Sequence, residues 1–290
     1  MYDPAQLAAL AAVHRRGAFD LAAAELHVTP SAISQRIKAL EEETGTLLIR
    51  RGTPCRATET GLRLIRHHDE IALLERSLEQ DLGLTPGPAM LRIAVNADSL
   101  ATWILPALAR TEGFLFDLVI DDQDVSQDWL RRGEVVAAIT SHPGPLQGCD
   151  TLPLGALRYR ATASPGYMAR WFPAGVTPEA LRQAPTLTFS DKDQLQARWV
   201  ARSLGPQRQA LPTHRMASSQ AFVDACLTGL GWGMNPEALV GPHLASGALR
   251  ELLPDTPLDV PLHWQFTRLA ALALAPVTQA IRRAAAGTLV

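Results

Sequence analysis

Residues 27–45, HVTPSAISQRIKALEEETG, combine hydroxyl, amide and positively charged side chains within one short stretch. Ser and Gln near the start of a helix can read base edges in the major groove of DNA, while Lys and Arg contact phosphates. Ile33, Ile37 and Leu40 are spaced to form the buried stripe of such a helix, and its acidic side chains come only at the far end. We therefore predict a DNA-reading helix with the contact residues Thr29, Ser31, Ser34, Gln35, Arg36 and Lys38.

The neighbouring segments supply the elements that would position this helix. Thr29 is a natural N-cap, and Pro30 stands at the first helical position, where its missing N–H costs nothing. A short helix before it and a tight turn from Leu26 to Thr29 complete a helix-turn-helix. An ordinary solvated helix face is the alternative interpretation of the polar side chains. The segment IRRGTPCRA (49–57) cannot be helical throughout, and its arginines suit a wing on the DNA backbone: Arg50, Arg51 and Arg56.

Residues 58–82 predict one long helix, because no helix breaker follows Gly61 and Thr58 is a good N-cap. Its apolar residues recur roughly at helical spacing: Leu62, Ile65, Ile71, Leu74 and Leu78. A helix of about 25 residues would be nearly 40 Å long at 1.5 Å per residue, and a single apolar stripe of that length requires a partner. Two such helices could pair as an antiparallel coil and form a homodimer. The alternative is a helix packed on its own domain.

The segment GLTPGP (83–88) is a Gly- and Pro-rich linker and the clearest domain boundary. Beyond it, short apolar runs such as LRIAV, FDLVI and VVAAIT alternate with helical patterns. Alternation of this kind predicts α/β structure with largely parallel sheets.

Composition limits the classes of protein to which the chain can belong. Its 290 residues suffice for about two domains, and no apolar run reaches the roughly 20 residues of a membrane span. No secretory signal is visible at the N-terminus. Cys55, Cys149 and Cys226 are odd in number and widely spaced, which favours buried thiols in a reducing cytoplasm over disulfides or a metal site. A formal charge of −2 does not exclude DNA binding, because the local arrangement of Lys and Arg decides it.

The sequence shows no sign of catalysis. It contains no HExxH, GxSxG or phosphate-cradling glycine loop and no pair of catalytic acids. The histidine pair His67-His68 stands on the long helix without further metal ligands. We therefore expect no catalytic residues, no metal and no cofactor, and we do not expect an enzyme.

The N-terminal motifs resemble those of LysR-type transcriptional regulators. The resemblance rests on Phe19, Ala22, Ala23 and Leu26, on a Ser-x-x-Ser at Ser31 and Ser34, and on a Thr-x-x-Gly at Thr58 and Gly61. Two departures are visible. Ala18 stands where the second helix usually has a Ser cap, and the usual order Ser-Arg-Gln is replaced by Ser34-Gln35-Arg36.

This resemblance implies a division of the whole chain. A winged helix-turn-helix (all-α with a small β wing) would cover 1–57, a linker and dimerisation helix 58–83, and a hinge 84–90. The remainder would be an α/β effector domain like a periplasmic binding protein, with subdomain I at 91–160 and 268–290 and subdomain II at 161–267. The chain would cross between the subdomains near Ala161 and Arg268.

An effector cleft between the subdomains would use helix N-termini, where backbone N–H groups bind anions such as carboxylates. The segments VNADSLATW and MASSQAFVDAC have the required form, although serine can also cap a helix without any ligand. Five aspartates near the expected cleft edges could hold a cation: Asp98, Asp121, Asp122, Asp124 and Asp191. The residues we predict to contact the effector are Ser99, Thr102, Asp122, Thr140, Ser141, Asp191, Ser218 and Ser219.

Several segments of this half, including VNADSLATWILPALA and SSQAFV, resemble the lysine- and arginine-sensing branch of the family. That branch controls export of basic amino acids and was also described as an inhibitor of replication initiation. The resemblance implies a cytoplasmic regulator that binds double-stranded DNA and a basic amino acid. It further implies a dimer, a tetramer formed from dimers, and RNA polymerase as a partner. An effector-independent architectural or replication-inhibiting DNA-binding protein is the alternative.

Overall fold

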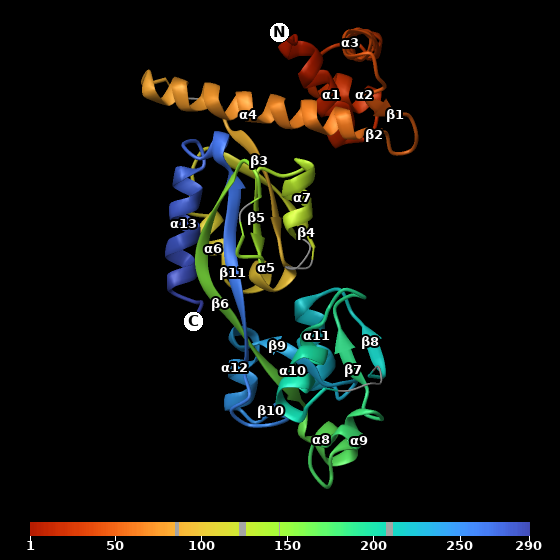
Figure 1. Cartoon of the computed structure of the whole chain (residues 1–290), viewed down its shortest axis with the longest axis vertical. Coiled ribbons are helices and arrows are strands. Elements are labelled where there is room, and N and C mark those ends of the chain that lie inside the picture. Colours follow the sequence, from red (N-terminus) through yellow and green to blue (C-terminus); the bar gives the residue numbers. More distant parts are fainter. Residues whose placement is uncertain (85–86, 122–125, 145, 207–210) are drawn as a thin grey trace.

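The computed structural model describes residues 1–84, 87–121, 126–144, 146–206 and 211–290. The N-terminal part, which we call the head, is a winged helix-turn-helix at one end of the molecule (Figure 1). Its helices are α1 (Pro4–Arg16), α2 (Phe19–Glu25) and α3 (Pro30–Thr44), and its wing is the antiparallel pair β1 (Ile49–Arg50) and β2 (Arg56–Ala57). The predicted DNA-binding fold is confirmed.

Local capping explains where these helices begin and end. Gly17 ends α1 with φ of 73°, a left-handed conformation that glycine adopts without strain. Ala18 precedes α2 and offers no side-chain cap. Thr29 caps α3, because its Oγ1 accepts a hydrogen bond from the Ala32 backbone N–H at 3.2 Å. The predicted stripe of Ile33, Ile37 and Leu40 is buried in the core of the head, so its opposite face is turned to solvent.

The long helix α4 spans Glu59–Asp81, as predicted, and Thr58 Oγ1 accepts a hydrogen bond from the Gly61 N–H at 3.1 Å. Its apolar residues do not form one stripe with one partner. Leu64 and Ile65 pack in the core of the head, whereas Leu73 packs in the core of the effector domain. Three leucines near its C-terminal end stay exposed: Leu74, Leu78 and Leu82. The helix therefore joins two cores and leaves a separate apolar face uncovered.

Subdomain I lies next to α4 in the middle of the molecule (Figure 1). Its parallel strands are β3 (Ala89–Val95), β4 (Phe114–Ile120) and β5 (Ala137–Thr140), so two residues of the predicted hinge 84–90 already belong to β3. Its helices are α5 (Ala97–Thr102), α6 (Ile104–Leu108), α7 (Ser126–Arg132) and α13 (Ala275–Ala286), with the short 3-10 turn η1 (Arg268–Ala270) before α13.

Subdomain II lies at the far end from the head (Figure 1). Its helices are α8 (Pro165–Trp171), α9 (Pro178–Leu181), α10 (Leu195–Leu204), α11 (Ser219–Leu227) and α12 (Glu237–Ala245). Its strands are β7 (Thr186–Thr188), β8 (Thr213–Arg215), β9 (Gly233–Pro236) and β10 (Arg250–Glu251). Tryptophans fill much of the common core, and Trp103, Trp199, Trp232 and Trp264 are fully buried. All three cysteines are buried and unpaired, as expected of inert thiols.

Two long strands, β6 (Cys149–Ala163) and β11 (Leu258–Thr267), connect the subdomains and pair with each other in antiparallel register. The described sheet order is β10-β6-β11-β5-β3-β4, with β9 paired to β6. The prediction of largely parallel sheets is therefore wrong: the sheet is mixed, because the chain returns through it along β11. Pairing with β5 begins at His263, and pairing with β9 begins at Tyr159. Ala161 itself pairs with β9, close to the predicted first crossing, whereas β11 already pairs with β5 at His263, before the predicted second crossing near Arg268.

None of the helices in the described part of the chain is long and apolar enough to cross a membrane.

Candidate functional site

The first half of α3 presents a polar face to solvent. Ser31, Ser34, Gln35 and Lys38 are exposed, and Arg36 is half-buried on the flank of the stripe. The Thr29 hydroxyl is already engaged as the helix cap and lies 3.0 Å from the Ser31 hydroxyl. Lys38 Nζ lies 3.6 Å from Glu42 Oε1, an exposed pair that DNA phosphates can readily replace. The chemical character of this face is that of a major-groove reader.

The wing carries arginines on both of its strands, and they face different surroundings. Arg50 is paired across the hairpin with Arg56, and both side chains are exposed. The guanidinium of Arg51 lies over the Phe19 ring, 5.5 Å from its centroid. Arg56, however, lines a cavity between the head and subdomain I. Of the three wing arginines, Arg50 is thus exposed without lining that cavity or lying over an aromatic ring.

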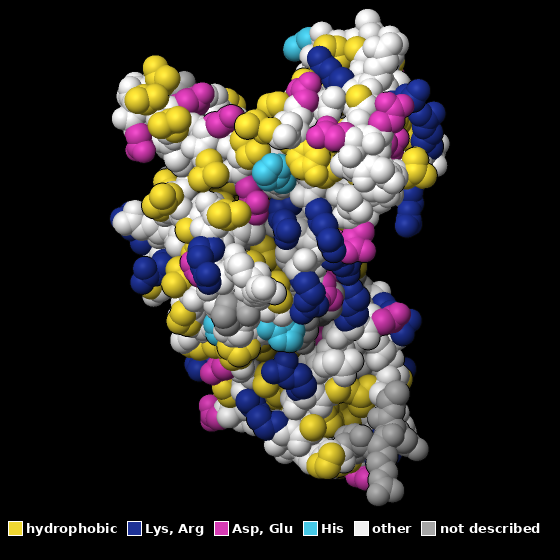
Figure 2. All heavy atoms as spheres, turned by 45° about the horizontal axis from the view of Figure 1, so that its top comes forward, with side chains coloured by type: hydrophobic (Ala, Val, Ile, Leu, Met, Phe, Trp, Pro, Cys, Tyr) yellow, Lys and Arg dark blue, Asp and Glu magenta, His cyan; other side chains and the backbone are white. Residues whose placement is uncertain are grey.

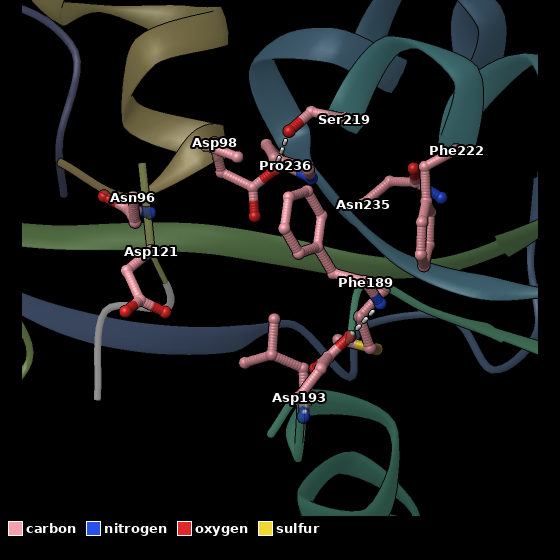
Figure 3. Close-up of a pocket in the computed structure, with 12 residues that line it drawn as sticks. Asn96, Asp98, Asp121, Phe189, Asp193, Ser219, Phe222, Asn235 and Pro236 are labelled. Atoms are coloured by element: carbon pink, nitrogen blue, oxygen red, sulfur yellow. Dashed lines mark hydrogen bonds between the residues drawn. The ribbon is translucent and has the colours of Figure 1, made fainter. Parts of the chain in front are cut away.

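A second candidate site is a cavity between the two subdomains, with an open volume of about 480 Å³ that includes solvent at its mouth (Figure 3). Subdomain I contributes residues from the end of β3 and the start of α5, and from the end of β4. Subdomain II contributes the segment before α10, the start of α11 and strand β9. The lining residues are Asn96, Ala97, Asp98, Asp121, Phe189, Asp193, Leu195, Ser219, Phe222, Met234, Asn235 and Pro236.

The carboxylate of Asp98 joins the two sides of this cavity. Its Oδ1 accepts a hydrogen bond from Ser219 Oγ at 2.6 Å, and its Oδ2 accepts one from the Tyr159 hydroxyl at 2.8 Å. Ser219 is the first residue of α11, so the carboxylate lies at the positive end of that helix (Figure 3). Asp98 thus holds α5 against α11 across the cleft.

Two further carboxylates line the cavity in different ways. Asp121 accepts hydrogen bonds from Trp129 Nε1 at 2.9 Å and from Lys192 Nζ at 3.2 Å, so it also connects the subdomains. Asp193 accepts from the backbone N–H groups of Phe189 at 2.8 Å and Leu195 at 3.0 Å, and so shapes the loop before α10. Together with Asp98 they give the cavity lining three carboxylates, of which Asp121 is paired with Lys192.

Asn235, on β9, presents an acceptor to the cavity. It is fully buried, and its Nδ2 donates to Thr162 Oγ1 at 2.9 Å and to Cys226 Sγ at 3.3 Å. Burial raises the pKa of Cys226 to about 12, so the thiol stays protonated and uncharged. Within the described residues Oδ1 of Asn235 has no hydrogen-bond partner. A buried unpaired acceptor is costly, and a bound N–H donor would satisfy it.

The structure brings only part of the predicted effector set to this cavity. Ser219 lines it, and Ser218 caps α11 by accepting from the Ala221 N–H at 3.3 Å. Ser99 is buried at the third position of α5 and does not open the helix, because α5 begins at Ala97. Neither Ser99 nor Ser218 is among the lining residues, and the same holds for four further predicted residues: Thr102, Thr140, Ser141 and Asp191. Asp122 and Asp124 lie outside the described residues.

Asp191 and Thr102 have other partners. Asp191 forms an ion pair with Arg215 at 2.6 Å on an exposed surface of subdomain II. Thr102 Oγ1 donates to the Asp98 carbonyl oxygen one turn earlier in α5. Thr140 Oγ1 accepts from the His142 N–H at 3.2 Å and so helps to shape the loop after β5.

Five polar or aromatic lining residues were not predicted from the sequence: Asn96, Phe189, Asp193, Phe222 and Asn235. A signal was present for two of them, because Asn96 directly follows the apolar run of β3 and Asn235 stands at the end of β9. Polar residues at the carboxyl ends of strands commonly form binding sites in α/β domains. No local signal marks Phe189 or Phe222, which only the packing of subdomain II places at the cavity.

Comparison with known proteins agrees with this architecture. Residues 4–62 match the family model of the bacterial regulatory helix-turn-helix protein, lysR family, and residues 88–289 match the LysR substrate binding domain. The chain belongs to the LysR family. It is a transcriptional regulator of the LysR type, and its overall likeness extends to both domains and to the helix between them.

Relatives of this regulator match it over their whole length. The HTH-type transcriptional regulator ArgP of Pseudomonas fluorescens is 43% identical, covering 100% of this chain and 99% of that protein. Among solved structures, ArgP from Mycobacterium tuberculosis superposes with a TM-score of 0.84 at 42% identity, covering 100% of this chain and 99% of that one. Full-length LysG from Corynebacterium glutamicum with bound effector Arg gives a TM-score of 0.72 at 34% identity, covering 99% of both chains.

Proposed function

We propose that this LysR-type regulator senses a basic amino acid, arginine or lysine, in the cleft between its subdomains. One observation carries the proposal: among the described residues, the cavity lining has three carboxylates and no Lys or Arg. Such a lining favours a cationic guest, because an anion would be repelled at close range. The relative LysG, whose structure contains bound Arg, supports the same effector class.

Different cavity residues would bind the different charged groups of such an effector. Asp98 and Asp121 would accept from a guanidinium or ammonium group, and the unpaired Oδ1 of Asn235 would accept a further N–H. Phe189 and Phe222 offer aromatic surface that a guanidinium can stack on. The start of α11 at Ser219 would receive the effector carboxylate, in place of the Asp98 carboxylate that lies there now.

Effector binding would change the contacts that cross the cleft. The Asp98–Ser219 and Asp121–Lys192 contacts both connect subdomain I with subdomain II. A guest that competes for these carboxylates shifts the population between two arrangements of the subdomains. Because α4 packs in the cores of both the head and the effector domain, that shift would alter the position of the DNA-binding heads.

The assembly that we propose is a homodimer through α4. Leu74 and Leu78 on the helix and Leu82 just after its end recur every four residues, with exposed fractions of 46%, 57% and 67%. Apolar side chains gather at the free end of this helix (Figure 2). Burying them against a second copy would remove an apolar face from water. We further propose that effector domains join dimers into a tetramer.

The DNA target that we propose is a promoter, with control of genes such as an amino-acid exporter and with RNA polymerase as a further partner. The exposed polar face of α3 supports recognition of the DNA base sequence, and the arginines of the wing support contact with the DNA backbone. A regulator of this kind acts on chromosomal DNA in the cytoplasm.

Calorimetric titration of the full-length protein with each of the twenty amino acids tests the sensing proposal. We expect saturable binding of arginine or lysine only, accompanied by a change in DNA mobility in gel shifts. If no amino acid binds and DNA affinity is constant, the effector-independent architectural role replaces the sensing one.

A pair of variants tests the roles proposed for α3 and the wing in DNA binding. Gln35→Ala should relax base preference, whereas Arg50→Ala should weaken all sequences alike and reduce the salt dependence of binding. Identical behaviour of both variants across a panel of operator sequences would contradict the placement of α3 in the groove.

A further inference from the structure

A second cavity lies between the head and subdomain I, with an open volume of about 730 Å³ that includes solvent at its mouth. His14, Arg15, Arg16 and Arg56 reach it from the head, and Arg92 and Asp117 reach it from strands β3 and β4. Lys and Arg side chains gather where the head meets subdomain I (Figure 2). None of the proposed roles in effector or DNA binding uses this cavity.

His14 contributes a hydrogen-bond donor to the cavity. The side chain is only 7% exposed, and its Nδ1 accepts a hydrogen bond from the Ala57 backbone N–H at 3.2 Å. A neutral imidazole that accepts at Nδ1 carries its proton on Nε2. Among the described residues, this Nε2–H has no hydrogen-bond partner. The wing therefore fixes the tautomer of His14 and leaves its Nε2–H available as a donor beside the cavity.

The guanidinium groups around His14 are incompletely neutralised. Arg56 forms no ion pair within the described part of the chain. Arg92 Nε lies 3.1 Å from Asp117 Oδ2, yet its buried N–H forms no hydrogen bond among the described residues. A guanidinium has five N–H donors, so Arg92 can keep Asp117 and still bind a second anion.

The remaining charged groups of the cavity lining, including the carboxylate of Glu25, are engaged in ion pairs. Arg15 pairs with Asp69 on α4, and Arg16 pairs with Glu25 on α2. Burial, together with the nearby guanidinium groups of Arg92 and Arg56, lowers the pKa of His14 to about 4. The cavity therefore has a positive potential even where its ion pairs are formed.

We propose that this cavity binds a phosphate group, held by the Nε2–H of His14 and the guanidinium groups of Arg56 and Arg92. Phosphate oxygens suit this donor set, because guanidinium groups bind them with charge-assisted, bidentate hydrogen bonds. The phosphate belongs either to a small free anion or to the DNA backbone. In both cases it connects the wing with strand β3 and fixes the head against subdomain I.

Titration of the full-length protein with inorganic pyrophosphate tests the site. The chloride concentration is lowered as pyrophosphate is added, so that the ionic strength stays constant. Calorimetry should show saturable binding, accompanied by a rise in Tm. Arg56→Gln should weaken binding about tenfold or more, since it removes a charged hydrogen-bond donor from the anion. Arg50→Gln is the matched control: it removes the same charge from the same hairpin, and Arg50 does not line the cavity. This control should bind like the wild type.

A spectroscopic readout separates anion binding from a general change in stability. Pyrophosphate should raise the pKa of His14, measured by NMR of its ring protons and assigned with His14→Gln, because the anion offsets the surrounding positive charge. Absence of saturable binding, or equal losses in Arg56→Gln and Arg50→Gln, would overturn the proposal.

The same titration with saturating operator duplex identifies the source of the phosphate group. Unchanged pyrophosphate affinity supports a small free anion as the occupant. Competitive loss of pyrophosphate binding that requires Arg56 supports a DNA backbone phosphate.

Discussion

The buried His14 makes a prediction about stability in mild acid. Its pKa of about 4 in the folded protein lies below the ordinary value of 6.5, chiefly because of burial. Above pH 6.5 the side chain is neutral in both states and has no effect on the balance between them. As the pH falls below 6.5 the unfolded chain binds the proton first, so the free energy of unfolding falls until about pH 4. At about 1.4 kcal/mol per pKa unit the whole loss is about 3 kcal/mol.

Urea unfolding of the wild type and of His14→Gln, in phosphate-free buffers between pH 7 and pH 5, measures this contribution. The Gln carboxamide oxygen can still accept from the Ala57 N–H, so the variant should fold and keep that contact. We expect the wild type to lose about 2 kcal/mol more than the variant over this range. His68, whose pKa is also lowered by burial, is present in both proteins and cancels in the difference. Parallel pH dependences for the two proteins would refute the assignment of a buried, neutral His14.

Three further outcomes follow from the geometry. Gly61→Ala should lower the free energy of unfolding by about 1–3 kcal/mol in urea melts, because an added Cβ would lie 2.4 Å from the Leu48 carbonyl oxygen; an unchanged midpoint would contradict this packing. Asp98→Asn should weaken arginine binding about 10- to 100-fold by calorimetry, whereas Asp191→Asn should leave it unchanged. If Asp191→Asn weakened binding and Asp98→Asn did not, the effector site would lie on the surface of subdomain II instead. Leu78→Glu should reduce the mass measured by light scattering to that of a smaller assembly, and an unchanged mass would exclude the α4 interface.

Much of the head could be predicted from the sequence, because its signals are local. The period of Ile33, Ile37 and Leu40 fixes which face of α3 is buried, and Thr29 and Gly17 mark helix ends through bonds to residues less than two turns away. These preferences act whatever the rest of the chain does. The outward placement of Ser34 and Gln35 follows from the same period.

The interior of the effector domain could be predicted only in outline. Apolar runs indicated the strands, but they do not record strand direction, and so the antiparallel return of β11 through the sheet was missed. The residues that line the cleft could not be predicted from the sequence either. Asp98 contacts Ser219, 121 positions away in the sequence, whereas Asp191 pairs with Arg215 on the surface.

By itself the sequence determined the DNA-reading helix, the long linker helix and the α/β class of the sensor, since each depends on patterns within a few turns or one strand. Only the tertiary structure decided which aspartates enter the cleft, that α4 packs in two cores, and that Arg56 faces His14 and Arg92. The physical reason is that these side chains take their orientation from contacts between segments far apart in the chain, and no local periodicity records which segments those will be.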